Sequence, residues 1–487
     1  MTNFTLPPPF AAHSVATGLF IGGQWRAAKN AIEVFNPSNG QLLTSVADGD
    51  ESDAGAAVDA AALAGPGWAA TAPRQRAEIL RKCHELMVAQ QDWLAALISL
   101  ENGKTLADAK AEILYAAEFF RWYSEEAVRV LGEVTLAPGG ANRILVEYQP
   151  IGVSLLITPW NFPAAMATRK LAPALAAGCS VILKPASETP LTALAIAQIM
   201  QDAGVPAGVV NVLTSHHAGV VAKKILHDPR VRKLSFTGST AVGRALLHEA
   251  ADQVISSSME LGGNAPFIVC GDADLNAALD GAMLAKMRNG GEACTSANRF
   301  YVERNLYKPF TDGMVARMAA LKLGEGSDPA TTLGPMINAK AVEKITELVE
   351  DAVAKGAKLL LGGTMLNRPG TYYPATVIAD VPDNARLLKE EIFGPVVALQ
   401  AFDSDAQVIA RANDTEYGLT AYLFTGDLKR GLRISEKLEV GMVGLNRGLV
   451  SDPAAPFGGV KQSGLGREGS HHGLMEFTEC KYVAVSW

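Results

Sequence analysis

The spacing of apolar residues divides the first third of the chain into a turn-rich part and a helical part. Residues 1 to about 50 carry turn residues between short apolar runs, which predicts small strands and loops. Over 52–64, 73–100 and 104–131, apolar side chains recur at helical spacing, and Asn102-Gly103 stands where a helix would end. We therefore expect a layer of helices after a turn-rich N-terminal segment.

After Pro150, short β-rich runs alternate with helical ones. The first series comprises residues 151–157, 164–177, 180–183, 191–202, 209–213, 219–226 and 233–236. A second series begins near Met259 and includes 300–302, 307–321, 339–355, 358–361 and 396–401. Strands that alternate with helices form parallel sheets covered by helices, so we expect two α/β domains.

Two further segments are typical of exposed strands. Residues 144–148 follow Gly139-Gly140 and resemble the second strand of a hairpin, and 481–487 are also β-like. An uncovered strand edge offers its backbone N–H and C=O groups to another chain. These strands, together with the high apolar content, predict a homo-oligomer.

Composition narrows the class of protein. The 487 residues suit two or three domains, with 48% apolar residues, 19% charged residues and a net charge of −7. The absence of a basic block argues against nucleic acid or an anionic membrane as partner. No run of about 18 apolar residues or signal peptide occurs, and the five scattered cysteines favour a reducing compartment, so we expect a cytoplasmic protein. No Cys or His pattern predicts a metal site.

Cys294 is the first candidate for chemistry. It follows Gly290-Gly291, which allows close backbone approach, and its small polar neighbours make it poor core filler. A lone cysteine is nevertheless more often structural than reactive, so this pattern alone leaves both interpretations open. The other four cysteines lie in apolar settings, and we assign them to packing.

Two polar residues at strand ends complete the candidate chemistry. Glu260 ends an apolar strand and leads into Gly262-Gly263, where a general base could stand in a crevice. Asn161 lies between two prolines directly after the strand 151–157, which could aim its amide at a developing oxyanion. Taken singly, a solvated strand-end charge and a proline-rich turn remain alternatives.

Glycine and small polar residues after two other strands suit a dinucleotide. Lys184 to Ser187 follow the strand 180–183, and Gly238-Ser239 follow the strand 233–236 and open a helix whose N–H groups would bind a pyrophosphate. Neither matches GxGxxG. The one literal GxGxxG, at 464–469, lies too close to the C-terminus for a βαβ unit, and we reject it as a dinucleotide fingerprint.

Together these segments resemble the NAD(P)-dependent aldehyde dehydrogenases over essentially the whole chain. The matching motifs are 159–163, 184–187, 236–239, 260–263, the glycine-rich approach to Cys294, 390–395, 456–459 and 463–464. Within that family, 157–166 with Arg169-Lys170 and 464–470 are most similar to succinate-semialdehyde dehydrogenases. Retention of Cys294, Glu260 and Asn161 argues against a catalytically silent scaffold.

The resemblance implies the aldehyde dehydrogenase fold and its division into parts. It implies a Rossmann-like NAD(P)-binding domain from 1–130 and 150–258 and an α/β catalytic domain from 259–447. Residues 131–149 and 472–487 would form a β-hairpin oligomerisation element of a dimer or tetramer. Residues 448–471 would complete the active site.

The resemblance also implies a role for each site residue. Cys294 would attack the aldehyde to give a thiohemiacetal and then a thioester, Asn161 would stabilise the oxyanion, and Glu260 would be the general base. Cofactor contacts would come from Thr158, Pro159, Trp160, Lys184, Ser187, Gly238, Ser239, Leu261, Glu391 and Phe393. Substrate contacts would come from Arg169, Arg288, Ser451 and Phe457. Lys170 and Glu468 would lie on a proton path.

The substrate and cofactor expectations follow from three positions. Arg169 and Arg288 suit an aldehyde that carries a carboxylate, foremost succinate semialdehyde, with glutarate semialdehyde, 2-oxoglutarate semialdehyde or lactaldehyde as alternatives. Ser187 stands where NAD-specific relatives often have Glu, so we expect NADP to be favoured and NAD to be accepted too. Arg447 and Asp452-Pro453 depart from the subfamily and would favour a longer or doubly charged substrate.

Overall fold

The first of two large sheets follows the predicted alternation of strands and helices. The computed structural model describes residues 3–486. This sheet has the strand order β23-β13-β12-β9-β10-β11-β3-β4. In that order the strands are Gly464–Leu465, Ser256–Glu260, Val231–Thr237, Val153–Ile157, Val181–Lys184, Val210–Val212, Leu19–Ile21 and Gln24–Arg26. The run from β13 to β11 is parallel, so the carboxyl ends of these strands meet at one edge.

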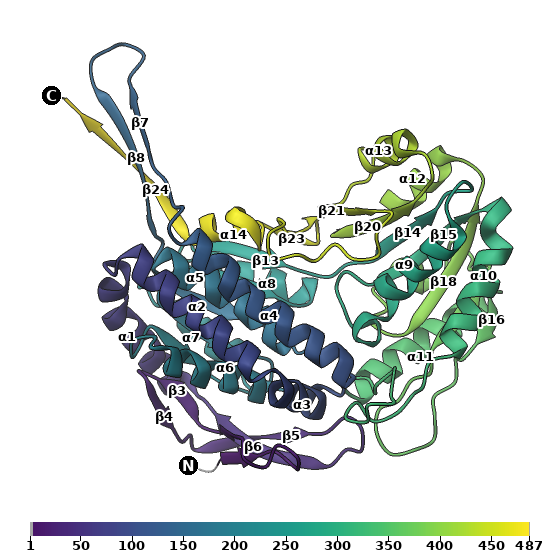
Figure 1. The fold of residues 1–487 in the computed structure, drawn as a ribbon, viewed down its shortest axis with the longest axis horizontal. Coiled ribbons are helices and arrows are strands. Elements are labelled where there is room, and N and C mark those ends of the chain that lie inside the picture. The colour runs from purple at the N-terminus through teal and green to yellow at the C-terminus, as the bar shows by residue number, and fades with distance from the viewer. Residues whose placement is uncertain (1–2, 487) are drawn as a thin grey trace.

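Helices cover both faces of this sheet (Figure 1). One face packs against α1 (Glu51–Ala69), α7 (Ala218–Leu226) and α8 (Thr240–Ala251). The other face packs against α5 (Pro163–Ala177) and α6 (Pro190–Ala203). Beyond these lie α2 (Pro73–Ala89), α3 (Gln91–Asn102) and α4 (Leu106–Glu126), which form the predicted helical layer.

The second sheet holds seven strands in the order β16-β17-β18-β15-β14-β20-β21. They are Lys358–Leu361, Thr376–Ala379, Val396–Phe402, Ala297–Glu303, Ala265–Val269, Thr420–Phe424 and Met442–Leu445. All neighbours are parallel except β16, which pairs antiparallel at the edge. Its helices are α9 (Leu275–Met287), α10 (Arg304–Ala319), α11 (Ala339–Ala354), α12 (Asp405–Asn413) and α13 (Leu428–Ser435). The predicted α/β fold class is confirmed.

A three-stranded ribbon stands away from the body of the molecule (Figure 1). It consists of β7 (Glu133–Leu136), β8 (Arg143–Pro150) and β24 (Thr478–Val485), all antiparallel. The predicted hairpin and C-terminal strand are therefore both present, although Trp487 lies outside the described residues. The remaining elements are Asn3–Thr5 (β1), Ser14–Ala16 (β2), Asn30–Phe35 (β5), Leu42–Asp48 (β6), Tyr417–Gly418 (β19), Val460–Lys461 (β22), Ser470–Met475 (α14) and two 3₁₀ turns at Arg288–Gly291 and Arg386–Leu388.

Three predicted helix boundaries are wrong. The segment 73–100 is two helices, because Gln90 leaves helical geometry (φ −108°, ψ 15°) and its N–H bonds back to Leu86 and Met87. Both helices bury their apolar sides in the same core, so the apolar spacing continues through the break. The first helix extends past its predicted end to Ala69 with Pro66 inside it, and the predicted helix at 104–131 spans only α4.

The second series of strands begins later than predicted. Met259 lies in β13, which pairs with β12 in the first sheet, and the first strand of the second sheet is β14. The rejected GxGxxG segment contributes β23, which pairs with β13. A Cβ at Gly464 would lie 2.1 Å from the carbonyl oxygen of Met259, so glycine there allows two strands to approach. Among residues 3–486, no helix has the length and apolar character needed to cross a membrane.

Candidate active site

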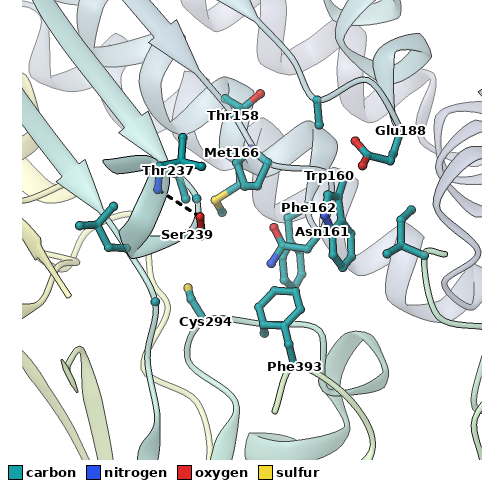
Figure 2. A pocket seen from close by; sticks show the side chains of 18 of the residues that line it. Thr158, Trp160, Asn161, Phe162, Met166, Glu188, Thr237, Ser239, Cys294 and Phe393 are labelled. Atoms are coloured by element: carbon teal, nitrogen blue, oxygen red, sulfur yellow. Dashed lines mark hydrogen bonds between the residues drawn. The ribbon is translucent and has the colours of Figure 1, made fainter. Parts of the chain in front are cut away.

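A cavity of about 610 Å³ lies at the carboxyl ends of β9, β10, β12 and β13. It brings together most of the residues singled out in the sequence, and Figure 2 shows Asn161 and Cys294 facing the same open space. The predicted residues that line it are Thr158, Pro159, Trp160, Asn161, Arg169, Lys184, Ser187, Gly238, Ser239, Leu261, Arg288, Cys294, Glu391, Phe393, Ser451 and Phe457. Glu260, Lys170 and Glu468 are not among the lining residues.

Asn161 is held in a turn between β9 and α5. Pro163 is the first residue of α5, where the missing N–H of proline costs no helical hydrogen bond. The Asn161 side chain is buried, and its Nδ2 donates to the carbonyl of Glu292 at 3.0 Å. A primary amide has two N–H donors, so one remains for an oxygen atom in the cavity.

Two glycines allow the backbone around Cys294 to pack closely against neighbouring segments. Gly291 has φ 83°, and a Cβ there would lie 2.4 Å from the carbonyl oxygen of Gly394. A Cβ at Gly263 would lie 2.4 Å from the carbonyl oxygen of Cys294 itself. These close approaches place the partly exposed thiol beside the end of β13 and the cavity.

The surroundings of the Cys294 thiol favour its protonated form. Burial raises its pKa to about 12, and the nearby carboxylates Glu260 and Glu391 raise it further, whereas the guanidinium groups of Arg169 and Arg288 oppose the rise. A thiolate is the nucleophilic form of cysteine. The site therefore needs a base that removes the proton when the aldehyde is bound.

Glu260 is a buried carboxylate suited to that task. Burial raises its pKa well above the ordinary range, and the Glu468 carboxylate adds to the rise against the opposing charges of Lys170 and Arg169. Neither Glu260 carboxylate oxygen has a hydrogen-bond partner among residues 3–486. A Cβ at Gly458 would lie 2.9 Å from Glu260 Oε1, so glycine leaves room beside the carboxylate.

Lys170 and Glu468 form a buried ion pair beside Glu260. Lys170 Nζ lies 2.5 Å from Glu468 Oε1 and donates to Ser235 Oγ at 3.0 Å. Both charges act on the pKa of Glu260, but no hydrogen bond joins Glu260 to either group among residues 3–486. The pair therefore influences the charge of Glu260 from inside the protein.

Two arginines gather around aromatic rings at one end of the cavity. The Arg169 guanidinium lies 4.1 Å from the ring centre of Phe457 and donates to the hydroxyl of Tyr115. The Arg288 guanidinium lies 4.7 Å from the ring centre of Phe162, and its Nη1 lies 3.5 Å from Ser451 Oγ. Arg169 is only 2% exposed, and its Nη1 lies 3.6 Å from Glu468 Oε2. Its Nε has no partner among the described residues, so together with Arg288 this end of the cavity can bind an anionic group.

The opposite part of the cavity has the features of a dinucleotide site. Ser239 caps α8, accepting the N–H of Val242 (Figure 2), so the N-terminus of this helix faces the cavity. Trp160 and Phe393 meet edge to face with ring centres 5.4 Å apart. These groups fit a phosphate and a flat ring, respectively.

Three polar groups in this part already bind backbone atoms. Lys184 Nζ donates to the carbonyl of Pro185 at 3.0 Å, and burial lowers the pKa of Lys184 to about 8. Ser187 Oγ donates to the carbonyl of Ser215 at 3.2 Å. Glu391 Oε1 accepts the N–H of Gly263 at 3.0 Å, and burial raises the pKa of Glu391 to about 7.

Several residues that line the cavity were not predicted from the sequence. Tyr115 lies on α4, where it reads as one more core position of an amphipathic helix. Lys340 and Lys344 lie one turn apart on α11, and this spacing alone places both on one face of a helix. Arg447 is not among the lining residues, and its Nε donates to the carbonyl of Leu449. Within residues 3–486, no group of three or more His, Cys, Asp or Glu could hold a metal ion.

Comparison of the sequence with known proteins finds matches in one family. The model of the aldehyde dehydrogenase family matches residues 25–483. The chain is 50% identical over 467 residues to the succinate-semialdehyde dehydrogenase [NADP(+)] of Escherichia coli strain K12, covering 96% of this chain and 97% of that protein. It is 48% identical over 469 residues to the glutarate-semialdehyde dehydrogenase of Pseudomonas putida strain KT2440, with the same two coverages.

A solved structure agrees with these relatives. The crystal structure of an NADP-dependent enzyme from E. coli superimposes with a TM-score of 0.96 at 49% sequence identity. The match covers 97% of this chain and 98% of that chain.

Proposed function

This chain belongs to the aldehyde dehydrogenase family, and we propose that it oxidises succinate semialdehyde to succinate, with NADP⁺ favoured and NAD⁺ also accepted. The observation that carries the choice of substrate is the pair Arg169 and Arg288 at one end of the cavity. Ser451 beside Arg288 adds a hydroxyl donor. A guanidinium binds a carboxylate with two parallel hydrogen bonds, so this end suits the acid group of a short semialdehyde.

The chemistry would begin at Cys294. Glu260 takes the thiol proton, and the thiolate attacks the carbonyl carbon to give a thiohemiacetal. The free N–H of the Asn161 amide and the backbone N–H of Cys294 stabilise the oxyanion. When bound, the nicotinamide would supply the hydride acceptor for this oxidation, and Cys294 would hold the acyl group as a thioester.

Hydrolysis of the thioester would use the same base. Glu260 removes a proton from water, the resulting hydroxide attacks the acyl carbon, and the Cys294 thiolate leaves as the acid is released. Lys170 and Glu468 carry the proton away from Glu260 through their buried pair. The raised pKa makes the Glu260 carboxylate a stronger base than an exposed glutamate, because burial and the Glu468 carboxylate favour its protonated form.

The cofactor preference is proposed from the polar groups after β10. Lys184 and Ser187 can both donate to a 2′-phosphate, and no carboxylate stands at position 187 to repel it. Glu188 lines the cavity next to Ser187 and offers an acceptor for the ribose hydroxyls of NAD⁺. Thr158, Pro159, Gly238, Ser239, Leu261, Glu391 and Phe393 would supply the remaining contacts.

The same site favours a second candidate substrate, glutarate semialdehyde. It differs from succinate semialdehyde by one methylene, and one methylene changes specificity by only about 1–3 kcal/mol. The Pseudomonas relative named above carries this substrate in its name. A comparison of the two aldehydes at equal enzyme concentration distinguishes the candidates.

We also propose roles for the parts of the chain, self-association and a cellular location. Residues 1–130 and 150–258 would bind the cofactor, 259–447 would carry the nucleophile, and 448–471 would close the site. The ribbon of β7, β8 and β24 supports self-association as a dimer or tetramer, because β7 is exposed along its whole length. Five unpaired cysteines support a cytoplasmic location.

Kinetics of arginine variants test the substrate proposal. Arg169→Ala and Arg288→Ala should each raise KM for succinate semialdehyde by about 10- to 150-fold, because each removes a charge-assisted hydrogen bond to the carboxylate. The KM for uncharged pentanal should rise much less. Arg447→Ala removes an exposed arginine outside the cavity lining and should change neither KM. Equal effects of the cavity variants on both aldehydes would refute the carboxylate contact.

A further inference from the structure

The turn that carries Asn161 is held from outside the cavity by three polar side chains. Asn102 Nδ2 donates to the carbonyl of Trp160 at 3.0 Å. Lys104 Nζ donates to the carbonyl of Asn161 at 2.6 Å, and Asn289 Nδ2 donates to the same oxygen at 2.8 Å. Two successive backbone carbonyls of the turn are therefore fixed by hydrogen bonds.

Lys104 belongs to a buried ion pair that spans this turn. Its Nζ lies 2.5 Å from Glu112 Oε2, and the two side chains are 1% and 0% exposed. The other oxygen of Glu112 accepts the N–H of Ala164 at 2.8 Å and of Ala165 at 3.3 Å, in the first turn of α5. The pair thus binds the backbone before and after Phe162, whose ring centre lies 4.3 Å from the ammonium.

Packing alone does not explain these charges. Two apolar side chains would fill the same space without the cost of removing an ammonium and a carboxylate from water. The hydrogen-bonding capacity that the pair retains goes to the Asn161 carbonyl and to the start of α5. We infer that Lys104 and Glu112 are positioning residues that hold the Asn161 amide in line with the aldehyde oxygen, an inference that rests on the proposed role of Asn161.

The position of the Asn161 amide leaves little tolerance. One of its N–H groups is committed to the carbonyl of Glu292, which Asn289 also binds at 3.1 Å, so the other must meet the oxyanion from a fixed direction. An oxyanion donor acts at about 2.7–3.1 Å. A displacement of about 1 Å can cost about 100-fold in rate.

A double-mutant cycle tests this inference. The four proteins are the wild type, Lys104→Met/Glu112→Gln, Asn161→Ala, and the combination of all three substitutions. Lys104→Met/Glu112→Gln leaves no unpaired buried charge, and the glutamine oxygen can still accept from α5. The measurements are kcat and KM for succinate semialdehyde with NADP⁺, together with Tm.

The two backgrounds should give different results. Lys104→Met/Glu112→Gln should lower kcat up to about 100-fold in the wild type, with little change in KM for NADP⁺, and by no more than about twofold when Asn161 is already Ala. An equal loss of kcat in both backgrounds, or no loss in the wild type, would overturn the inference. If Asn161→Ala alone kept the wild-type kcat, the proposed role of Asn161 would be wrong as well, which separates the two failures.

A second lysine–glutamate pair, in which the lysine is buried and the glutamate is partly exposed, provides the control. Lys233 Nζ lies 3.0 Å from Glu476 Oε2, outside the cavity lining. Lys233→Met/Glu476→Gln should shift Tm without the background-dependent loss of kcat. If the Lys104→Met/Glu112→Gln protein does not fold, Lys104→Arg replaces it in the cycle, because it keeps the charges and changes the reach of the donor, and the same outcomes decide.

Discussion

The two ends of the cavity differ in how their polar groups are satisfied. At the aldehyde end, Glu260 lies behind the lining residue Leu261, buried and with no hydrogen-bond partner among residues 3–486. Arg169 is 2% exposed, and its Nε has no partner although its terminal nitrogens face Tyr115 and Glu468. At the cofactor end, Ser187, Lys184 and Glu391 already bind backbone atoms of the protein. The first end thus keeps polar groups that a substrate can satisfy, whereas the polar groups of the second end are satisfied by the protein backbone.

This difference assigns different work to the two ends. A buried polar group without a partner is costly, and it gains most when a reacting group arrives. A group that is already hydrogen-bonded exchanges one partner for another and contributes a smaller net energy. We therefore expect substitutions at the aldehyde end to change turnover, and substitutions at the cofactor end to change cofactor preference.

Glu260→Gln should have the largest effect of the changes considered. Loss of a general base lowers kcat by about 10²–10⁴-fold. Because the pKa of Glu260 is raised, the wild-type rate should fall as the pH drops through that pKa, and the variant should lose this dependence. The measurement is kcat from pH 6 to pH 10.

Glu101→Gln is the matched control for that experiment. Its carboxylate is also buried, but it accepts the N–H groups of Leu191 and Thr192 at the start of α6, whereas the Glu260 carboxylate has no hydrogen-bond partner among residues 3–486. It should keep the wild-type pH profile. Glu260→Gln with full activity would remove the base from the mechanism and erase the contrast between the two ends.

Asn161→Ala comes next. Removing one oxyanion donor typically lowers kcat by about 10²–10³-fold, and KM for NADP⁺ should change little. Asn161→Asp keeps the shape but replaces the N–H donor by a carboxylate, so it should be at least as slow. Activity near the wild-type value in either variant would contradict the role of this turn.

At the cofactor end, Ser187→Glu should have a smaller and more selective effect. A carboxylate there would repel the 2′-phosphate and bind the ribose hydroxyls, lowering kcat/KM for NADP⁺ by about tenfold and leaving NAD⁺ unchanged or improved. Ser187→Ala, which removes only the hydroxyl, is the uncharged control. Equal kcat/KM for NAD⁺ and NADP⁺ in the wild type, unchanged in Ser187→Glu, would show that this end does not bind the 2′-phosphate selectively.

The smallest expected effect is on stability. The pKa of Glu260 is higher in the folded protein than in the unfolded chain, so stability is lost as the pH rises through the folded-state pKa. Glutamine cannot ionise, so Glu260→Gln should raise Tm by about 1–4 °C at pH 8.5 and by less at pH 6. A Tm difference that does not vary with pH would show that the buried charge is not the cause.

Strand ends explain why much of the cavity could be predicted from the sequence. Asn161, Ser187 and Ser239 each follow a short apolar strand, and parallel strands bring their carboxyl ends to one edge. The resemblance to a family, and not this pattern, supplied Leu261 and the substrate-binding residues. Local patterns also predicted the end of α3, where Gly103 adopts φ 90°. These inferences needed only the order of elements along the chain.

Residues that meet only through tertiary packing could not be predicted. Tyr115 fits the apolar spacing of α4, and Glu112 is one of several charged residues on that helix. Neither position indicates that Tyr115 binds Arg169 or that Glu112 binds the start of α5. The break at Gln90 carries neither glycine nor proline, and both flanking helices pack into one core, so nothing in the spacing marks it. Such contacts depend on how helices lie across the sheet, which periodicity does not encode.

The aldehyde preference of the wild-type enzyme tests the proposed substrate most directly. Initial rates of NADPH formation would be measured for succinate semialdehyde, glutarate semialdehyde and uncharged pentanal, with NADP⁺ saturating. We expect kcat/KM for succinate semialdehyde to exceed that for pentanal by at least about tenfold, because two arginines line the end of the cavity proposed to bind the acid group. A pentanal value equal to or above that of both anionic aldehydes would contradict it.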